Sequence, residues 1–208
     1  MGCDIHNHIE YKKTINGGPK WICGDYYHVN PYCEEGADNR DKKLSLVGFY
    51  DNRNYSLFAT LANVRNYGDT PYICNPRGLP KDVSAEVKED SDYWDCDGHS
   101  HSYFTLRELI EYQKNIKPLR HRGMISPEAQ RNLDENGVLP KEWCQSTNQE
   151  GWEFREWKTE NTVLIPLIES LKQRANELHI IYDFLWETNY EEALKRAENI
   201  RMVFWFDN

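Results

Sequence analysis

The sequence lacks the features that would place it in a membrane or outside the cell. No window approaches the roughly 20 consecutive apolar residues that a membrane-spanning helix needs. The first residues show neither the basic stretch nor the apolar core of a secretory signal. A Met-Gly-Cys start is compatible with a lipid anchor, but the myristoylation pattern requires Ser or Thr at position 6, where this chain has His6. We therefore expect a cytoplasmic protein with no membrane contact.

Positive charge is also scarce. Lys and Arg number 25 against 34 Asp and Glu, which gives a formal net charge of −9 over 208 residues. This balance disfavours a broad cationic face for nucleic acids, although a local basic groove stays compatible with it. Hydrophobic residues make up 39% of the chain, with 7 Trp, 13 Tyr and 7 Phe, so a core can be buried. We expect one globular domain over residues 1–208.

Cysteine pairs with metal-binding or redox spacing are missing. None of the 6 cysteines forms a C-x-x-C pair, which excludes the usual zinc-finger and thioredoxin-like patterns. Disulfides are not expected in a chain of this length without a secretory signal, so the thiols should be free. A structural zinc site drawn from scattered Cys and His stays open but has no support from spacing.

Two regions of the chain predict strands of one sheet. Residues 3–13 alternate like a half-buried strand, residues 16–18 supply a turn, and residues 21–28 return as the second arm of a hairpin. Residues 201–206 are dense in strand-forming side chains and apolar at nearly every position, so we place this strand centrally, beside the first one. The polar stretch 30–43 is typical of a surface loop.

Capping signals and apolar spacing predict helices over much of the remaining chain. Thr105 followed by Glu108 forms a capping box for a helix that ends near Pro118. Ser126-Pro127 starts a short helix that Gly137 closes. Further helices are expected over 53–65, 162–179 and 190–199, whereas 67–104 is mostly irregular with one helical turn after Asp82. The fold class is therefore α+β, with a small, mainly antiparallel sheet covered by helices.

The first strand carries a row of metal-ligating residue types. Because side chains alternate along a strand, Asp4, His6, His8 and Glu10 share one face, opposite an apolar face that needs burial. Two imidazoles at positions i and i+2 can reach one ion such as Zn²⁺, Mn²⁺, Fe²⁺ or Ni²⁺. The alternative is a row that simply faces water.

A second histidine cluster lies just ahead of the capped helix. Asp97, His99 and His101 follow one another in a loop-like stretch, and a helix N-terminus beside them favours anions. His6 and His8 are then candidate metal ligands, with His99 and His101 closing the site and Asp4 and Asp97 as ligands or general bases. Two such clusters with acids can hold a metal whose bound water becomes a nucleophile.

Further residues have both a functional and a structural interpretation. Arg53 could contact an anionic ligand and Arg77 could clamp a phosphate, but a solvated arginine or an ordinary salt bridge fits these residues equally well. Asp207 could complete a metal shell if the last strand lies beside the first, or could be frayed. A thiol nucleophile at Cys3 or Cys96 satisfies cysteine–histidine chemistry only loosely.

The D-x-H-x-H string at positions 4–8 looks like the first-strand motif of amidohydrolases and PHP phosphoesterases, but the chain lacks the alternating strand–helix pattern and length of their barrels. The paired-histidine phosphoesterase motif fails, because no Ser or Thr lies two residues after any of the four clustered histidines. Only the local ligand chemistry of the first resemblance is relevant here.

The chain as a whole resembles a family of bacteriophage and bacterial proteins that opens with M-G-C-D-I-H-x-H-x-E. The resemblance continues through the blocks Arg53-Asn54-Tyr55 with Leu57-Phe58-Ala59, Pro76-Arg77-Gly78-Leu79-Pro80 with Asp82-Val83-Ser84, Asp97-Gly98-His99-Ser100-His101-Ser102, and Val203-Phe204-Trp205-Phe206-Asp207-Asn208. It implies a phage-type accessory protein in the bacterial host cytoplasm and no particular reaction.

The sequence therefore leads to one main functional hypothesis. We expect a metal-dependent hydrolase-like protein acting on a phosphoester or nucleotide-type substrate, with Zn²⁺ as the first choice of metal and Mn²⁺ or Fe²⁺ as alternatives. The alternative is a non-catalytic protein that sequesters a small ligand or blocks a host protein. A third interpretation gives the histidine row a purely structural role on a solvated face.

Overall fold

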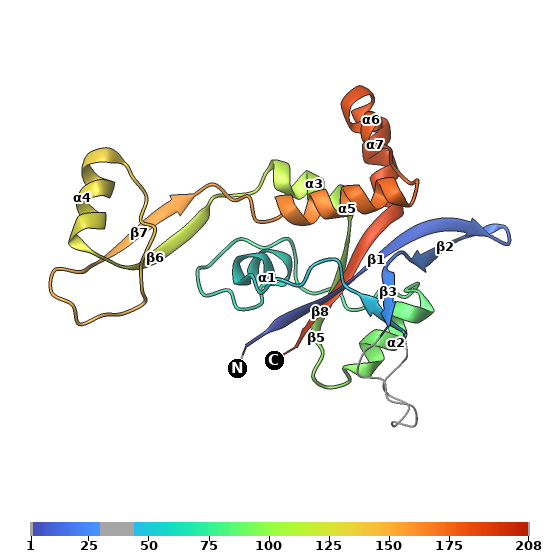
Figure 1. Cartoon of the computed structure of the whole chain (residues 1–208), viewed down its shortest axis with the longest axis horizontal. Coiled ribbons are helices and arrows are strands. Elements are labelled where there is room, and N and C mark those ends of the chain that lie inside the picture. Colours follow the sequence, from blue (N-terminus) through green and yellow to red (C-terminus); the bar gives the residue numbers. More distant parts are fainter. Residues whose placement is uncertain (1, 30–43, 208) are drawn as a thin grey trace.

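The computed structural model describes residues 2–29 and 44–207, and the expected loop at 30–43 lies outside them. Its centre is a four-stranded antiparallel sheet in the order β2-β1-β8-β5 (Figure 1). These strands are β1 (Asp4–Ile15), β2 (Gly18–Cys23), β5 (His99–Thr105) and β8 (Ile200–Asp207). The combination of this sheet with helices confirms the α+β class.

Local turn chemistry and burial explain the two strands that the sequence predicts best. Asn16 and Gly17 take positive φ values of 50° and 84°, which suits the tight turn of a hairpin between β1 and β2. Strand β8 pairs with β1 from Asp4↔Asp207 to Tyr11↔Ile200, so the last strand lies centrally beside the first, as predicted.

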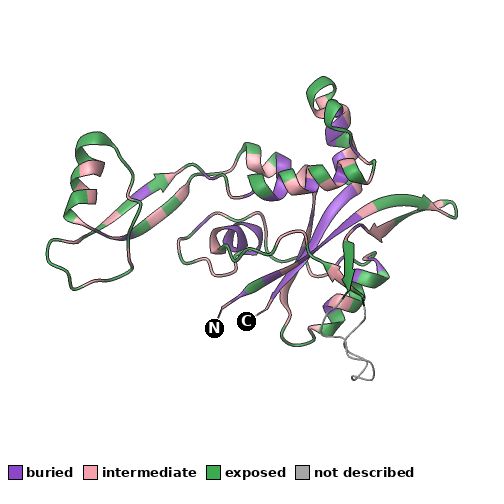
Figure 2. Cartoon of the chain, viewed as in Figure 1, coloured by how far each residue is buried: buried purple, intermediate pink, exposed green. Residues whose placement is uncertain are grey.

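Helices cover one face of the sheet. Ile5, Ile9, Phe204 and Phe206 belong to the main buried cluster together with apolar side chains of several helices. These helices are α1 (Tyr55–Ala62), α3 (Leu106–Lys114), α5 (Ile165–Glu177), α6 (Asp183–Thr188) and α7 (Tyr190–Arg196), the last running into a 3₁₀ turn, η1 (Ala197–Asn199). Figure 2 shows the burial concentrated in the central strands and the helix sides that face them.

Among the described residues, one helix packs on the opposite face. Helix α2 (Ala85–Tyr93) contributes Val87, which is fully buried against Val203 and Trp205 of β8. The sequence predicted only one helical turn here. Because α2 carries charged and polar side chains at most positions, its apolar periodicity is weak. Its buried contacts with the sheet are made by Val87 and by Ser91, whose hydroxyl lies 3.0 Å from His101 Nε2.

The capping signals located the starts of two other helices, although α3 ends at Lys114, before the end predicted near Pro118. Thr105 and Glu108 form the predicted capping box of α3. Helix α4 (Pro127–Asn136) starts after the N-cap Ser126 and ends at Gly137, whose φ of 65° is the left-handed conformation that glycine tolerates. The predicted helices over 53–65, 162–179 and 190–199 are also present, as α1, α5 and α7 with η1.

The remaining strands form two separate ribbons. The hairpin arm expected over residues 21–28 is divided between them and the main sheet, because β2 ends at Cys23 and residues 26–29 form a strand of one ribbon. The other three strands of the ribbons were not predicted from the sequence. Strands β3 (Tyr26–Val29) and β4 (Leu44–Val47) pair beside α2, and β6 (Leu119–Ile125) pairs with β7 (Glu153–Thr159). The β6–β7 ribbon and α4 project from the body of the molecule as an arm (Figure 1). Strands β6 (LRHRGMI) and β7 (EFREWKT) carry charged side chains among the apolar ones and lack a continuous apolar face, so periodicity alone did not reveal them.

Within the described residues, no helix is long and apolar enough to cross a membrane. The cysteines in this part of the chain are free thiols, in line with the expectation from their spacing.

Candidate functional site

The polar row of β1 lies on the sheet face beneath α2. His6 and His8 both stack on Trp205, with ring centroids 5.8 and 5.0 Å away. Ile5 and Ile9 lie in the apolar cluster on the other face, so the alternation of β1 predicted from the sequence is confirmed. Trp205 itself is fully buried and forms the floor on which the histidines rest.

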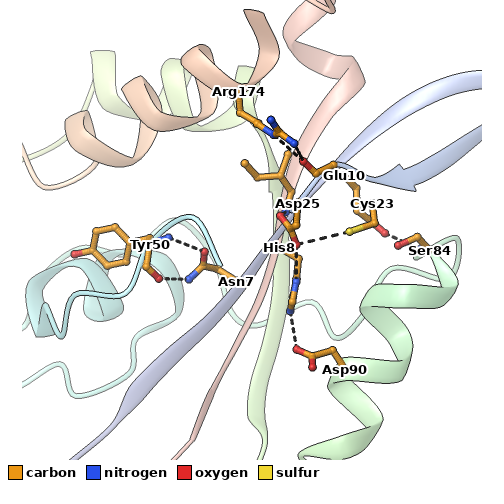
Figure 3. A network of polar contacts seen from close by, with 11 residues as sticks. Asn7, His8, Glu10, Cys23, Asp25, Tyr50, Ser84, Asp90 and Arg174 are labelled. Carbon is orange, nitrogen blue, oxygen red and sulfur yellow. Dashed lines mark hydrogen bonds and ion pairs between the residues drawn. The ribbon is translucent and has the colours of Figure 1, made fainter. Parts of the chain in front are cut away.

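His8 lies between two carboxylates (Figure 3). Its Nδ1 is 2.7 Å from Asp25 Oδ2, and its Nε2 is 3.0 Å from Asp90 Oδ2 in an ion-pair contact outside hydrogen-bond geometry. The side chains of His8 and Asp25 are 4% and 1% exposed, whereas that of Asp90 is 40% exposed. Burial opposes the charged imidazole, but Asp25 and Asp90 outweigh it and raise the pKa of His8 to about 9.

His6 is paired with the last strand. Its Nε2 lies 3.2 Å from Asp207 Oδ2, and both side chains are about one-fifth exposed. The other oxygen of Asp207 accepts a hydrogen bond of 3.0 Å from the Asp4 backbone N–H, which fixes the carboxylate at this end of the sheet. Asp207 is therefore held beside His6 and is not frayed. This is the position expected if the last strand pairs with the first.

Asp4 and Arg53, predicted as a catalytic acid and a substrate ligand, bind each other. Arg53 Nε donates to Asp4 Oδ1 at 2.8 Å and Nη2 to Oδ2 at 2.5 Å. The Arg53 guanidinium holds the pKa of the Asp4 carboxyl below its usual range. Both side chains are about half exposed, so the pair lies at the rim of the candidate site.

Glu10, the last member of the row, is part of a buried ion network. Its carboxylate accepts hydrogen bonds from Arg201 Nε at 2.7 Å and from the Ser84 backbone N–H at 2.6 Å. Arg201 Nη1 in turn donates to Asp82 at 2.8 Å. Both oxygens of Glu10 are thus engaged, and this residue fastens the loop before α2 to the sheet.

The second histidine cluster divides between the two faces. His101 stacks on Trp205 at 5.5 Å and its Nε2 lies 3.0 Å from the Ser91 hydroxyl of α2, so it joins His6 and His8. His99 instead stacks on Phe206 of the apolar face at 6.1 Å. The pairing of β5 with β8 shifts by one residue between His99 and Ser102, where Ser100 has a φ of 54°.

Two expectations from the sequence about this cluster are wrong, and the β-bulge explains the second. The cluster lies on a strand and not on a loop, and its two histidines do not act as an H-x-H pair on one face. Burial and the neighbouring His99 both lower the pKa of His101, so it stays a neutral imidazole at physiological pH.

Asp97 and Arg77 lie in different surroundings. Asp97 is exposed and lines a hollow of about 540 Å³ with Trp94, whose ring lies 3.9 Å from that of His6. Arg77 pairs with Glu108 at 2.8 Å and packs over the Phe104 ring at 4.5 Å. The structure therefore gives Arg77 the salt bridge that was its alternative interpretation.

The residues that sequence reasoning missed are those that complete the surroundings of the histidines. Asp25 and Asp90 contact His8, Ser91 contacts His101, and Trp205 lies beneath all three imidazoles. Asp25 follows the hairpin directly, and this was the one local signal available for it. Asp90 and Ser91 carry no pattern of their own, because α2 brings them over the sheet only in the folded protein.

The chemistry of this face is that of paired nitrogen and oxygen donors. Among residues 2–29 and 44–207, no group of three or more His, Cys, Asp or Glu side chains is already arranged as a metal site. Two imidazole–carboxylate pairs on this face have a carboxylate open to solvent, His8 with Asp90 and His6 with Asp207. Behind them, His8 and Asp25 form a third pair that is buried.

Comparison of the chain with models of known protein families, with curated protein sequences and with solved structures gave no match.

The Cys23 thiol, 3.7 Å from Asp25 Oδ2, is not a nucleophile at neutral pH. Burial, followed by the charge of Asp25, raises the pKa of Cys23 to about 12, so the thiolate population is small. We expect iodoacetamide near neutral pH to modify the exposed Cys96 at least roughly tenfold faster than Cys23. Peptide mass spectrometry over time measures both rates, and Cys96→Ser should remove the fast site alone. Labelling of Cys23 at the rate of Cys96 would contradict the prediction.

Proposed function

We propose that the sheet face around Trp205 is a divalent-metal site that hydrolyses phosphoesters, with His6, His8, Asp90 and Asp207 as the protein ligands. One observation carries the proposal. His6 and His8 lie on the same face of β1. The Nε2 of His6 is 3.2 Å from Asp207 Oδ2, and that of His8 is 3.0 Å from Asp90 Oδ2. At such a separation the two atoms of a pair can bind the same cation. Mixed nitrogen and oxygen donors favour Zn²⁺, with Mn²⁺ or Fe²⁺ as alternatives.

Asp25 supports this assignment as a positioning residue. It faces Nδ1 of His8 and so leaves Nε2 as the metal-binding nitrogen, an arrangement common behind metal-bound histidines. Each imidazole–carboxylate pair supplies two donors, so a cation held by one pair would keep its remaining coordination positions for water and substrate. The acidic surroundings of Asp4, Asp25, Asp90 and Asp207 offer a cation favourable electrostatics.

The partly open His6–Asp207 end is where substrate would enter. Asp97, on the adjoining hollow, would accept a proton from the attacking water in this proposal. Water attacks phosphorus, the phosphorus–oxygen ester bond breaks, and the leaving oxygen takes up a proton. The Arg53 guanidinium lies half exposed at the rim, where it could leave Asp4 for a phosphate oxygen, and this supports a phosphoester substrate.

Elemental analysis of the purified protein tests the ligands. We expect about one bound Zn²⁺, Mn²⁺ or Fe²⁺ per chain or more, with loss of most of it in His6→Ala and Asp90→Asn. Asp25→Asn should weaken metal affinity roughly 10- to 100-fold by releasing the His8 ring. His99→Ala is the matched control, because His99 stacks on the other face and should leave metal content unchanged.

Turnover of bis(p-nitrophenyl) phosphate and p-nitrophenyl phosphate then tests the reaction. Added Zn²⁺ or Mn²⁺ should support hydrolysis by the wild type and the His99→Ala protein, and not by His6→Ala. Absence of metal in the wild type, or equal loss in His99→Ala, would overturn the assignment of the ligands. Bound metal with no turnover of either ester would overturn the hydrolase and favour the alternative of non-catalytic binding.

A further inference from the structure

A separate cleft lies between the β6–β7 arm and the loop that follows α1. Its volume is about 750 Å³, within the range of small-molecule binding sites. One wall comes from α1 and residues 65–70, and the other from β6 with Trp143 and Phe154. Helix α1 packs on the Phe206 side of the sheet, so this cleft lies away from the histidine face beneath α2.

The charge of the cleft is opposite in sign to that of the whole chain. Its lining contains Arg65, Arg120 and Arg122 against Asp69 as the single acidic side chain, in a protein of net charge −9. The guanidiniums of Arg120 and Arg122 are close to half exposed. The lining also contains the imidazole of His121. Burial lowers the pKa of His121, so this side chain stays neutral near pH 7. The arginines are the dominant charges here.

These arginines can exchange their present partners for an anion. Arg120 contacts Glu156 at 2.6 Å and Arg122 contacts Asp69 at 3.4 Å, and in both pairs each side chain is more than 40% exposed. Exposed ion pairs of this kind contribute little to stability, so replacing a carboxylate by a phosphate costs little. Guanidinium groups match phosphate oxygens with two parallel hydrogen bonds.

Aromatic side chains lie open beside the arginines. Tyr67, Phe154 and Trp143 are 59%, 56% and 45% exposed and all line the cleft. The Trp143 ring packs closely on β6 at Gly123, where an added Cβ would lie only 2.6 Å from it. Exposed, positioned rings next to guanidinium groups are the surfaces on which nucleobases stack.

Contacts across the cleft hold its two walls in place. Arg122 Nη2 donates to the Tyr67 carbonyl at 2.8 Å. A Cβ on Gly68 would lie 3.3 Å from the Arg120 carbonyl, which shows how closely the loop approaches β6. The arginines and rings are thus presented on a preformed surface, which reduces the entropy lost on binding.

We propose that this cleft binds a nucleotide, with Arg120 and Arg122 on the phosphate and Trp143, Phe154 or Tyr67 stacked on the base. The basic surface is small and the chain carries a net charge of −9, which favours a mononucleotide or a short single-stranded segment over a long polyanion. This binding site is independent of the proposed metal site, which lies on the other face of the sheet.

Isothermal titration calorimetry of the full chain tests the proposal with AMP, GMP, CMP and UMP, a single-stranded thymidine octanucleotide and inorganic phosphate as probes. We expect at least one nucleotide or the octanucleotide to bind with a Kd below roughly 1 mM, and inorganic phosphate at least tenfold more weakly. Binding of mononucleotides identifies a free nucleotide as the ligand, and binding of the octanucleotide alone identifies a nucleic-acid segment.

Variants locate the binding. Arg122→Ala and Trp143→Ala should each weaken binding roughly tenfold or more, since one removes a phosphate contact and the other a stacking surface. Arg155→Ala is the matched control on the same arm, because Arg155 pairs with Asp134 and Glu153 and does not line the cleft. Circular dichroism verifies that each variant keeps its fold.

Three results would overturn the proposal. They are no binding of any nucleotide or the octanucleotide at millimolar concentration, equal affinity for inorganic phosphate and nucleotides, and equal weakening by Arg155→Ala. Metal content and ester hydrolysis are measured separately, so failure of this proposal and failure of the metal site are distinguishable.

Discussion

Replacement of Arg201 by methionine is expected to lower the free energy of unfolding by about 3–5 kcal/mol, because it leaves the Glu10 carboxylate buried without its counter-charge. The side chains of Arg201 and Glu10 are 4% and 0% exposed, so solvent cannot take over the lost contact. This is the largest single-residue effect that we expect in the protein.

The size of the effect follows from the position of the pair. Arg201 and Glu10 face each other across β8 and β1, the two central strands of the sheet. The Glu10 carboxylate also accepts the Ser84 N–H, and Arg201 reaches Asp82, so the pair joins the sheet to the loop that leads into α2. Loss of Arg201 therefore weakens the attachment of the helix that carries Asp90.

Urea unfolding followed by circular dichroism measures the change. The double variant Glu10→Gln with Arg201→Met should recover part of the loss, because it removes the stranded charge as well. Arg107→Ala is the control, since Arg107 pairs with Glu111 and Glu198 on an exposed surface and should cost about 1 kcal/mol or less. A loss of the same small size in Arg201→Met would show that water reaches Glu10 and that the network is not buried in solution.

In the presence of EDTA, the stability of the protein is expected to fall as the pH rises from 6.5 to above 9, because His8 loses its proton over this range. The pKa of His8 is about 9 in the folded protein and near 6.5 when unfolded. The folded state thus binds the proton more tightly, and its stabilisation is fully present below pH 6.5 and lost as the pH rises through 9. The expected contribution is about 3 kcal/mol.

The comparison with His8→Gln isolates this contribution. Other groups titrate in both proteins, so the difference between their unfolding free energies across pH 6 to about 10 reports on His8 alone. His121→Gln is the matched control: burial lowers the pKa of His121, so that residue changes stability only as the pH falls below 6.5. If the wild type and His8→Gln differ by a constant amount across the range, Asp25 and Asp90 do not hold a charged imidazole.

The same measurement bears on the metal site. A cation on Nε2 of His8 displaces the proton, so Zn²⁺ added in place of EDTA should flatten the pH dependence of the wild type. His6, at the partly open end of the face, would remain a ligand in that state.

Much of the fold could be predicted because its signals are local. The turn at Asn16-Gly17, the capping box at Thr105 and Glu108, and the Ser126 and Gly137 caps each depend on a few neighbouring residues. The β6–β7 ribbon gave no such signal. Its strands lack a continuous apolar face. They pair with each other although residues 126–152 lie between them in the sequence, so no short-range pattern reveals the pairing.

In the candidate site, too, local features could be predicted from the sequence and those that depend on distant segments could not. Because side chains alternate along a strand, the sequence placed Asp4, His6, His8 and Glu10 on one face. The same rule failed at His99 and His101, because it assumes a regular strand and the bulge at Ser100 adds a residue to β5 opposite β8. Such a bulge depends on pairing with a distant strand.

The sequence by itself determined the strand that carries the histidines, the apolar strand that pairs with it and the caps of the helices, because backbone periodicity and turn chemistry act over a few residues. Only the tertiary structure decided what each acid and base faces. Asp4 faces Arg53, Glu10 faces Arg201, and His8 faces Asp25 and Asp90. These pairings join residues far apart in the chain, and their energies depend on burial that exists only after α2 has closed over the sheet.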